Sequence, residues 1–103
     1  MKKLAVIILN WNGLKLLQEF VPGVAATTIG PDVDLIVADN GSSDDSCAWL
    51  AANYPQVRLL RLPENYGFAG GYNRALEQTG YPLTVLLNSD VRTTPGWAET
   101  LLG

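Results

Sequence analysis

Four short apolar runs, at residues 4–9, 33–38, 57–62 and 83–87, constrain the fold more than any other feature of the chain. Turn-forming residues bound each run, and each run is continuous rather than alternating. A continuous apolar run of this length is typical of a parallel β-strand covered on both faces by other elements. The sequence therefore predicts a buried parallel sheet.

Helical periodicity fills the gaps between these runs. Helices are predicted over residues 13–26, 44–53 and 68–79, and a last short helix from Pro95 onward. The second helix is expected to follow a capping pair and to carry acidic residues in its first turn. The third is expected to end at Gly80. The capping pair before the second helix is Ser42 and Ser43. The apolar residues that support the other two helices are Phe68, Tyr72, Ala75 and Leu76 in the third and Trp97, Leu101 and Leu102 in the last.

Alternation of strands and helices predicts an α/β protein with right-handed crossovers. The expected architecture is a three-layer α/β/α unit with a four-stranded parallel sheet in the order 3-2-1-4, in which the first and fourth strands are central. The chain of 103 residues forms one domain at most, residues 1–103.

Composition excludes several classes of function. The net charge is −3 with seven lysine and arginine residues, so no nucleic-acid-binding surface is expected. The chain has no histidine, which excludes a Ser-His-Asp or Cys-His catalytic unit and zinc sites that contain histidine. The single cysteine, Cys47, is expected to be a buried thiol rather than a nucleophile.

No run reaches the roughly 20 apolar residues that span a bilayer, so no transmembrane segment is expected. Lys2 and Lys3 precede an apolar run, as in a signal peptide, but the run is too short and is followed by Asn10 rather than by a cleavage site. The chain is expected to be cytoplasmic. A peripheral position of a longer parent protein at the inner membrane face is compatible with this expectation.

Every apolar run is followed by a polar segment, at residues 10–13, 39–44, 63–67 and 88–90. In parallel α/β sheets, ligands bind beyond the carboxyl ends of the strands. Because these four segments follow the four strands, they are expected to surround one ligand site.

Asp39 follows the second apolar run, where its carboxylate could accept hydrogen bonds from a nucleoside base or ribose. The alternative is an Asx turn, which the segment 39–41 also suits. A Rossmann dinucleotide site would need a glycine-rich turn after the first strand, where Trp11 and Asn12 stand instead. A receiver-type signalling domain would need acidic residues there, and Asn10 is neutral.

The segment 65–73 has three glycines around the start of the third helix, where exposed backbone amides can bind an anion. Close packing of this helix on the sheet would explain the glycines equally well. Asp90, after the fourth strand, could hold Mg²⁺ or Mn²⁺ together with substrate phosphates, or could cap a helix. Arg74 and Arg92 could each meet a phosphate, although a solvated surface charge is the simpler interpretation.

Four segments together resemble motifs of family 2 glycosyltransferases with the A-type fold, particularly their rhamnosyltransferase-like bacterial branch. They are VIILNWNG (residues 6–13), IVADNGSSD (36–44), NYGFAGGYN (65–73) and LLNSD (86–90). The resemblance covers the whole chain, and the four motifs occur in the family's order at the predicted strand ends.

The resemblance implies a role for each motif. Leu9, Asn10, Asn12 and the Asp39 carboxylate would hold the uracil or thymine of a UDP- or dTDP-linked sugar donor. The nucleotide and diphosphate would lie against the loop and helix start that contain Asn65, Gly67, Gly70 and Asn73. Asp90 matches the last Asp of the family's Asp-x-Asp motif and would bind Mg²⁺ or Mn²⁺. Asn88 replaces the first Asp; it can bond a ribose hydroxyl but brings no charge to the metal.

Family members carry the catalytic base and the acceptor site after the Asp-x-Asp strand. This chain is accordingly expected to be the nucleotide-sugar-binding portion of a glycosyltransferase, without a catalytic residue of its own. The parent enzyme would transfer a sugar to a saccharide or lipid-linked acceptor, with inversion, in cell-surface polysaccharide synthesis. The alternative is a non-catalytic homodimerising or regulatory module of the same fold, and a homo-oligomer is expected in either case.

Overall fold

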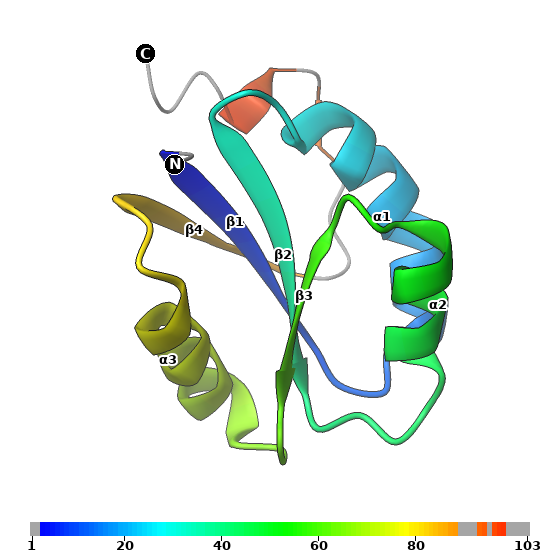
Figure 1. Cartoon of the computed structure of the whole chain (residues 1–103). Coiled ribbons are helices and arrows are strands. Elements are labelled where there is room, and N and C mark those ends of the chain that lie inside the picture. Colours follow the sequence, from blue (N-terminus) through cyan, green and yellow to red (C-terminus); the bar gives the residue numbers. More distant parts are fainter. Residues whose placement is uncertain (1–2, 89–92, 95, 99–103) are drawn as a thin grey trace.

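A computed structural model of the chain describes residues 3–88, 93–94 and 96–98. The strands are β1 (Leu4–Asn10), β2 (Val33–Asn40), β3 (Arg58–Leu62) and β4 (Leu83–Leu87), and the helices are α1 (Leu14–Thr28), α2 (Ser46–Asn53) and α3 (Gly67–Thr79). All neighbouring strands pair in parallel in the order β3-β2-β1-β4 (Figure 1), which confirms the predicted fold and strand order.

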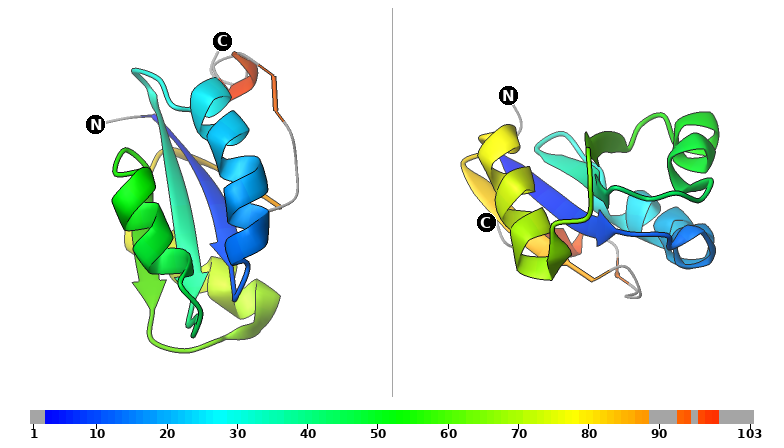
Figure 2. Two further views of the ribbon diagram at one scale, coloured as in Figure 1. Left: turned by 90° about the vertical axis from the view of Figure 1, so that its right-hand side faces the viewer. Right: turned by 90° about the horizontal axis from the view of Figure 1, so that it is seen from below.

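Helices cover the sheet on both faces. The helices α1 and α2 lie on one face and α3 lies on the other, as both views in Figure 2 show. Two successive crossovers, through α1 and α2, build the sheet outward from β1 to β3. The third crossover returns over the opposite face and places β4 on the free side of β1.

Alternation of side chains along the strands divides the core into two parts. Even-numbered residues of β1, such as Val6 and Ile8, pack with Leu35 and Val37 of β2 against α1 and α2. The odd-numbered Ile7 of β1 belongs to the smaller core under α3. The apolar runs are continuous because both sets of side chains are buried.

Element boundaries differ from the prediction by at most two residues. The predicted capping of α2 by Ser42 and Ser43 is wrong, since this helix begins at Ser46 after the N-cap residue Asp45, whose side chain makes no capping hydrogen bond, and it has no acid in its first turn. The reason is that Ser42 and Ser43 are engaged with the loop after β1, as described below.

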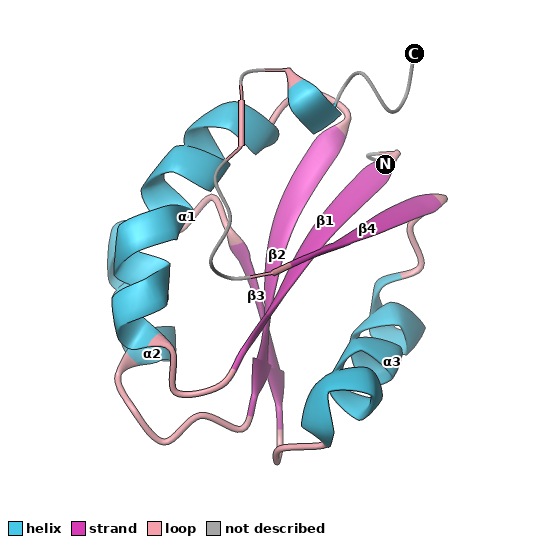
Figure 3. Cartoon of the chain, turned by 180° about the vertical axis from the view of Figure 1, so that it is seen from behind, coloured by secondary structure: helices cyan, strands magenta, loops and turns pink. Residues whose placement is uncertain are grey.

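The strand β4 is an edge strand of the described sheet and pairs only with β1, so the expectation that it is central is wrong (Figure 3). Its side chains are correspondingly less buried than those of β1. Both Leu83 and Leu86 are about half exposed, at 51% and 46%.

Two helical predictions hold in part. The helix α3 buries Tyr72 and Ala75 and ends at the left-handed Gly80 as predicted, but Phe68 and Leu76 are exposed. Near the end of the chain, Trp97 is in a helical turn, packs on the core and donates its indole N–H to Thr28 Oγ1 at 2.8 Å. Pro95, Leu101 and Leu102 lie outside the described residues.

No helix among the described residues has the length and apolar character that crossing a bilayer requires.

Candidate functional site

A cavity of about 510 Å³ opens at the carboxyl ends of the strands. The polar segments after β1, β2 and β3 lie at this end of the sheet, at the bottom of Figure 1, and Asn88 after β4 lines the cavity. The residues that line the cavity are Leu9, Trp11, Leu16, Asn40, Asn65, Gly67, Phe68, Tyr72 and Asn88. Amide and aromatic side chains dominate the lining, and no described lining residue is charged.

The parity of the strands decides which predicted residues reach this cavity. Leu9 of β1 and Asn40 of β2 line it, together with Tyr72 of α3. Asn10 and Asp39, each one position away, point to the opposite face of the sheet, as alternation requires. The segments after β1 and β2 therefore contribute to two separate clusters, one on each face.

Asn40 organises the wall of the cavity. Its side-chain amide is 2% exposed and makes three hydrogen bonds: Nδ2 donates to Asn65 Oδ1 at 3.1 Å and to the Gly67 carbonyl at 3.0 Å, and Oδ1 accepts from the Tyr66 amide at 3.0 Å. Asn65 Oδ1 also accepts the amide of Gly67, the first residue of α3, at 2.7 Å. This network fixes the loop before α3 to the end of β2.

Asp39 lies on the other face and is 2% exposed. One carboxylate oxygen accepts from Asn10 Nδ2 at 2.9 Å and from Ser42 Oγ at 2.6 Å, and the other accepts from the Ser42 amide at 2.9 Å. The carboxylate therefore holds the loop after β2 locally through an amide three residues later, whereas the Asx turn that the sequence left open bonds the amide two residues later. The Asp39 carboxylate is therefore already bonded by the loops that follow β1 and β2.

Asn12 joins the loop after β1 to the loop after β2. Its Oδ1 accepts the amides of Ser43 at 2.8 Å and Asp44 at 3.2 Å, and its own amide donates to Ser42 Oγ at 2.8 Å. Of the described non-glycine residues, only Asn12 has a positive φ, at 48°. Asparagine tolerates this left-handed conformation better than most residues.

The Asp44 carboxylate links the starts of two helices. It accepts the amide of Leu14, the first residue of α1, at 3.2 Å, and the amide of Ser46, the first residue of α2, at 3.0 Å. It also accepts the Ser46 hydroxyl. Partial desolvation acts to raise the pKa of Asp44, but the hydrogen bonds from Ser46 and Leu14 together outweigh it and lower this pKa below the ordinary value.

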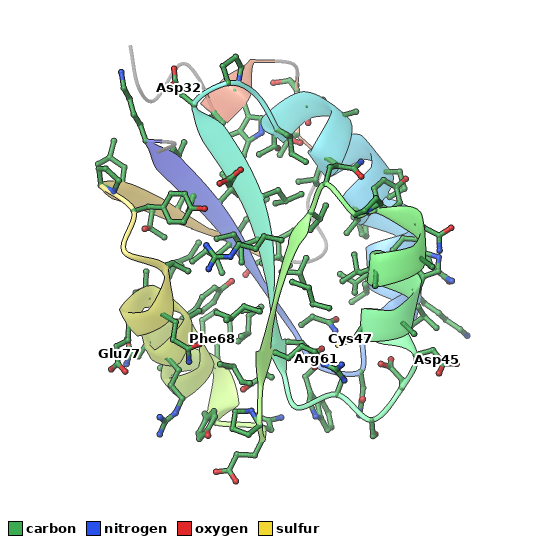
Figure 4. The ribbon with its side chains drawn as sticks, viewed as in Figure 1. Asp32, Asp45, Cys47, Arg61, Phe68 and Glu77 are labelled. Carbon is green, nitrogen blue, oxygen red and sulfur yellow. The ribbon has the colours of Figure 1, made fainter. Side chains whose placement is uncertain are left out.

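Two aromatic side chains of α3, Phe68 and Tyr72, form one wall of the cavity. Tyr72 is buried, its hydroxyl donates to the Leu87 carbonyl at 3.0 Å, and burial raises its pKa. Phe68 packs edge-on against it, with ring centroids 5.0 Å apart, and extends from α3 as labelled in Figure 4. Arg74 lies over the ring of Tyr66 at 3.7 Å, a cation–π contact that accounts for this charge without a phosphate.

Of the predicted nucleotide-binding residues, Leu9, Asn65, Gly67 and Asn88 line the cavity. Asn10, Asn12, Asp39, Gly70 and Asn73 do not. Asp90 and Arg92 lie outside the described residues, within which no three acidic or cysteine side chains gather as a metal cluster.

Sequence reasoning did not single out Trp11, Leu16, Asn40, Phe68 and Tyr72 as lining residues. Two signals could have found some of them. Trp11 and Phe68 are large aromatic residues inside otherwise polar segments, and both are exposed, at 55% and 66%. Asn40 follows Asp39 directly in β2, so alternation along the strand places its side chain on the opposite face, the face of Leu60 and Leu62 in neighbouring β3.

The fold and the cavity are those of a doubly wound α/β domain, a class of protein in which ligands bind at the carboxyl ends of the strands. A family model described as glycosyl transferase family 2 matches residues 5–103. The chain therefore belongs to glycosyl transferase family 2, as the four motifs indicated.

Relatives of this chain are longer proteins. The N-acetylglucosaminyl-diphospho-decaprenol L-rhamnosyltransferase of Mycobacterium tuberculosis is 29% identical over 110 residues, which cover 96% of this chain and 36% of that enzyme. The uncharacterised glycosyltransferase YfnE of Bacillus subtilis is 30% identical over 92 residues, which cover 86% of this chain and 23% of YfnE. The chain thus spans about a third or less of the length of these relatives.

Solved structures share the fold. S. aureus TarS residues 1–349 superpose with a TM-score of 0.80 at 21% identity, over 99% of this chain and 31% of that one. The mannosyltransferase PcManGT from Pyrobaculum calidifontis, solved with GDP-Man and Mn²⁺, gives a TM-score of 0.75 at 22% identity, over 96% of this chain and 30% of that one. TarS has also been solved with UDP-GlcNAc.

Proposed function

We propose that residues 1–103 form the nucleotide-sugar-binding portion of an enzyme that transfers a sugar from a UDP- or dTDP-linked donor to an acceptor hydroxyl. The observation that carries the proposal is the cavity of about 510 Å³ at the carboxyl ends of the strands, lined by amides and aromatic rings. Such a lining suits a nucleoside, because amides can pair with a base or ribose and aromatic rings can pack on them. Family membership supports the same assignment.

Within the cavity, Asn65 and Asn88 offer amides to the base or ribose. Gly67 and the start of α3 leave room for the diphosphate, and Leu9 and Phe68 provide apolar walls. The predicted roles of Asn10, Asn12, Asp39, Gly70 and Asn73 as direct ligands stay predictions. No acid lines the described part of the cavity, so the base that activates the acceptor hydroxyl is not among these residues.

A divalent metal fits this site chemically. Asn88 reaches the cavity directly after β4, and Asp90 follows two positions later. One carboxylate, completed by phosphate oxygens and water, is a set of hard oxygen ligands of the kind that Mg²⁺ and Mn²⁺ take. When bound, the ion would neutralise charge on the diphosphate. We propose Asp90 as its protein ligand; PcManGT, which has the same fold, has been solved with Mn²⁺.

The acceptor and the setting of the reaction are further parts of the proposal. The rhamnosyltransferase relative is named for a decaprenol-linked acceptor, which favours a lipid-linked saccharide and a place in cell-surface polysaccharide synthesis. Such an acceptor lies in a membrane, so a peripheral position at the inner membrane face would bring the site to it. Inversion at the transferred carbon belongs to the same proposal.

Isothermal titration calorimetry with UDP, dTDP, ADP and GDP in the presence of Mn²⁺ tests the donor assignment. We expect UDP or dTDP to bind more tightly than ADP and GDP. Asn88→Ala should weaken this binding, because Asn88 is exposed and lines the cavity, whereas the exposed Gln78→Ala on α3 should not. Equal, weak binding of all four diphosphates would contradict the proposal.

The metal has its own test. The same titration in EDTA should lose most of the affinity, and Asp90→Asn should bind equally weakly with or without Mn²⁺. Affinity in EDTA equal to that in Mn²⁺ would remove the metal from the proposal and leave the nucleotide assignment intact.

A further inference from the structure

We propose that Asn12 is a positioning residue, which clamps the loop after β1 onto the loop after β2 and thereby holds Trp11 at the mouth of the cavity. The inference rests on the proposed function, because it concerns how the same cavity recognises its ligand. It assigns to Asn12 an indirect role through Trp11, in place of direct contact with the nucleotide.

Trp11 lies between two anchored residues. Before it, the side chain of Asn10 is 2% exposed and donates to Asp39 Oδ1 at 2.9 Å and to Ser42 Oγ at 3.3 Å. After it, Asn12 accepts the amides of Ser43 and Asp44. Trp11 itself is 55% exposed and lines the cavity. Its position is therefore set by its neighbours rather than by burial of its own ring.

The hydroxyl of Ser42 connects both anchors. It donates to Asp39 Oδ1 at 2.6 Å and accepts from Asn10 Nδ2 at 3.3 Å and from the Asn12 amide at 2.8 Å. A serine hydroxyl has one donor and two acceptor positions, so all three are used. The two residues that flank Trp11, Asn10 and Asn12, thus both bond to Ser42 Oγ, whose hydrogen-bonding capacity is filled.

The backbone conformation of Asn12 sets the direction of the chain after Trp11. Its φ of 48° is left-handed and turns the chain sharply after Trp11 toward the start of α1. A left-handed non-glycine residue persists only where its surroundings hold it, and the contacts of Asn12 Oδ1 supply that hold. Without them the loop could relax, and the Trp11 ring would be free to leave the mouth of the cavity.

Asn12→Gly removes the Oδ1 acceptor but keeps the backbone conformation, because glycine adopts a positive φ without strain. Asn12 is exposed, so water can satisfy the amides of Ser43 and Asp44 and the fold should persist. Asn12→Asp keeps the Oδ1 acceptor and should restore the native behaviour. Ser43→Ala is the matched control, since it removes only a weak 3.4 Å contact to Asn12 and keeps the Ser43 amide.

The readout in the free protein is the indole N–H signal of Trp11 in a ¹H–¹⁵N spectrum, identified with Trp11→Phe among the three tryptophans of the chain. We expect Asn12→Gly to shift or broaden the Trp11 signal and to leave those of Trp49 and Trp97 in place. Ser43→Ala and Asn12→Asp should leave all three unchanged. A native Trp11 signal in Asn12→Gly would overturn the proposal.

The second readout is UDP or dTDP affinity by calorimetry. Asn12→Gly should lose roughly two- to tenfold, the cost of ordering about one side chain on binding. In a Trp11→Ala background the same change should have no further effect, because its route to the ligand is gone. A loss that persists in that background would show direct contact and refute the positioning role. If the native chain binds no nucleotide, the proposed function fails, and the Trp11 signal alone decides the clamp.

Discussion

At the scale of single residues, burial and the neighbouring Asp39 at the end of β2 set the pKa of the Cys47 thiol. It is buried on α2, facing the sheet near Arg61 (Figure 4). Burial raises the pKa of the thiol from 9.0 to about 11, the neighbouring Asp39 carboxylate adds to the increase, and Arg61 opposes it. Because the thiolate is the nucleophile, the described structure makes Cys47 inert, in agreement with the sequence-based expectation.

We therefore predict slow alkylation of Cys47. A pKa of about 11 in place of 9.0 lowers the thiolate fraction at pH 8 by roughly a hundredfold, before access is considered. Mass spectrometry of iodoacetamide modification at pH 8 should show at least this difference between the native chain and the chain unfolded in urea. Similar rates in both states would contradict the buried position of the thiol.

The same shift predicts the direction of alkaline destabilisation. Between pH 9 and about 11 the unfolded chain loses the Cys47 proton while the folded chain retains it, so stability falls as pH rises through this window. Burial also raises the pKa values of Tyr72 and Tyr81, which extends the fall above pH 10. In urea titrations at pH 8 and pH 10, Cys47→Ala should lose less stability between the two pH values than the native chain does. An equal loss would exclude Cys47 as a cause.

At the scale of elements, the packing of α3 on the sheet depends on one small residue. A Cβ atom on Gly71 would lie 2.9 Å from Leu9 Cδ1 and 2.9 Å from Asn40 Nδ2, closer than side-chain contacts allow. Asn40 cannot move freely, because its amide makes three hydrogen bonds. One of the glycines after Asn65 thus serves close helix–sheet packing, the structural alternative that the sequence left open.

Gly71→Ala should lower the free energy of unfolding by about 1–3 kcal/mol, the usual cost of overpacking. It should also weaken nucleotide binding, because Leu9 and Asn40 line the cavity. Gly23→Ala is the matched control: Gly23 lies within α1, and a Cβ there would meet nothing within 4 Å beyond its two chain neighbours and the backbone of its own helix, so the change should stabilise the helix by about 0.5–1 kcal/mol. Urea denaturation measures both, and equal effects would refute the close contact.

At the scale of the whole molecule, the two edges of the sheet differ. The edge strand β3 carries the exposed Arg58 and Arg61, and charged side chains of this kind discourage pairing with another strand. The other edge strand, β4, contains no charged residue and exposes about half of Leu83 and Leu86. Trp97, an apolar residue of the last predicted helix, packs on the core and is not part of this edge.

We therefore predict that this chain self-associates through β4. Light scattering over a concentration series should show a mass that rises above that of the monomer, and Leu86→Lys should return the chain to a monomer. The exposed Gln78→Lys on α3 carries the same charge and should not. A monomer at all micromolar concentrations would contradict the prediction without affecting the nucleotide site.

The sequence by itself determined the order of elements, the parallel sheet and the end of the sheet where a site forms. These properties follow from local patterns: apolar continuity, helical periodicity and the position of polar segments after each strand. The family motifs added candidate residues at the correct end. That part of the site was predictable because the carboxyl ends of parallel strands must share one edge.

Only the tertiary structure decided which face of the sheet each candidate serves. Asp39 and Asn40 are neighbours in the sequence, yet Asp39 joins the cluster beside α2 and Asn40 lines the cavity beside α3. Alternation shows that they point apart, but the cavity's face depends on where α3 packs. The contacts of Asn12 with Ser42 and Ser43 span about thirty residues, and such long-range hydrogen bonds leave no periodic signal in the sequence.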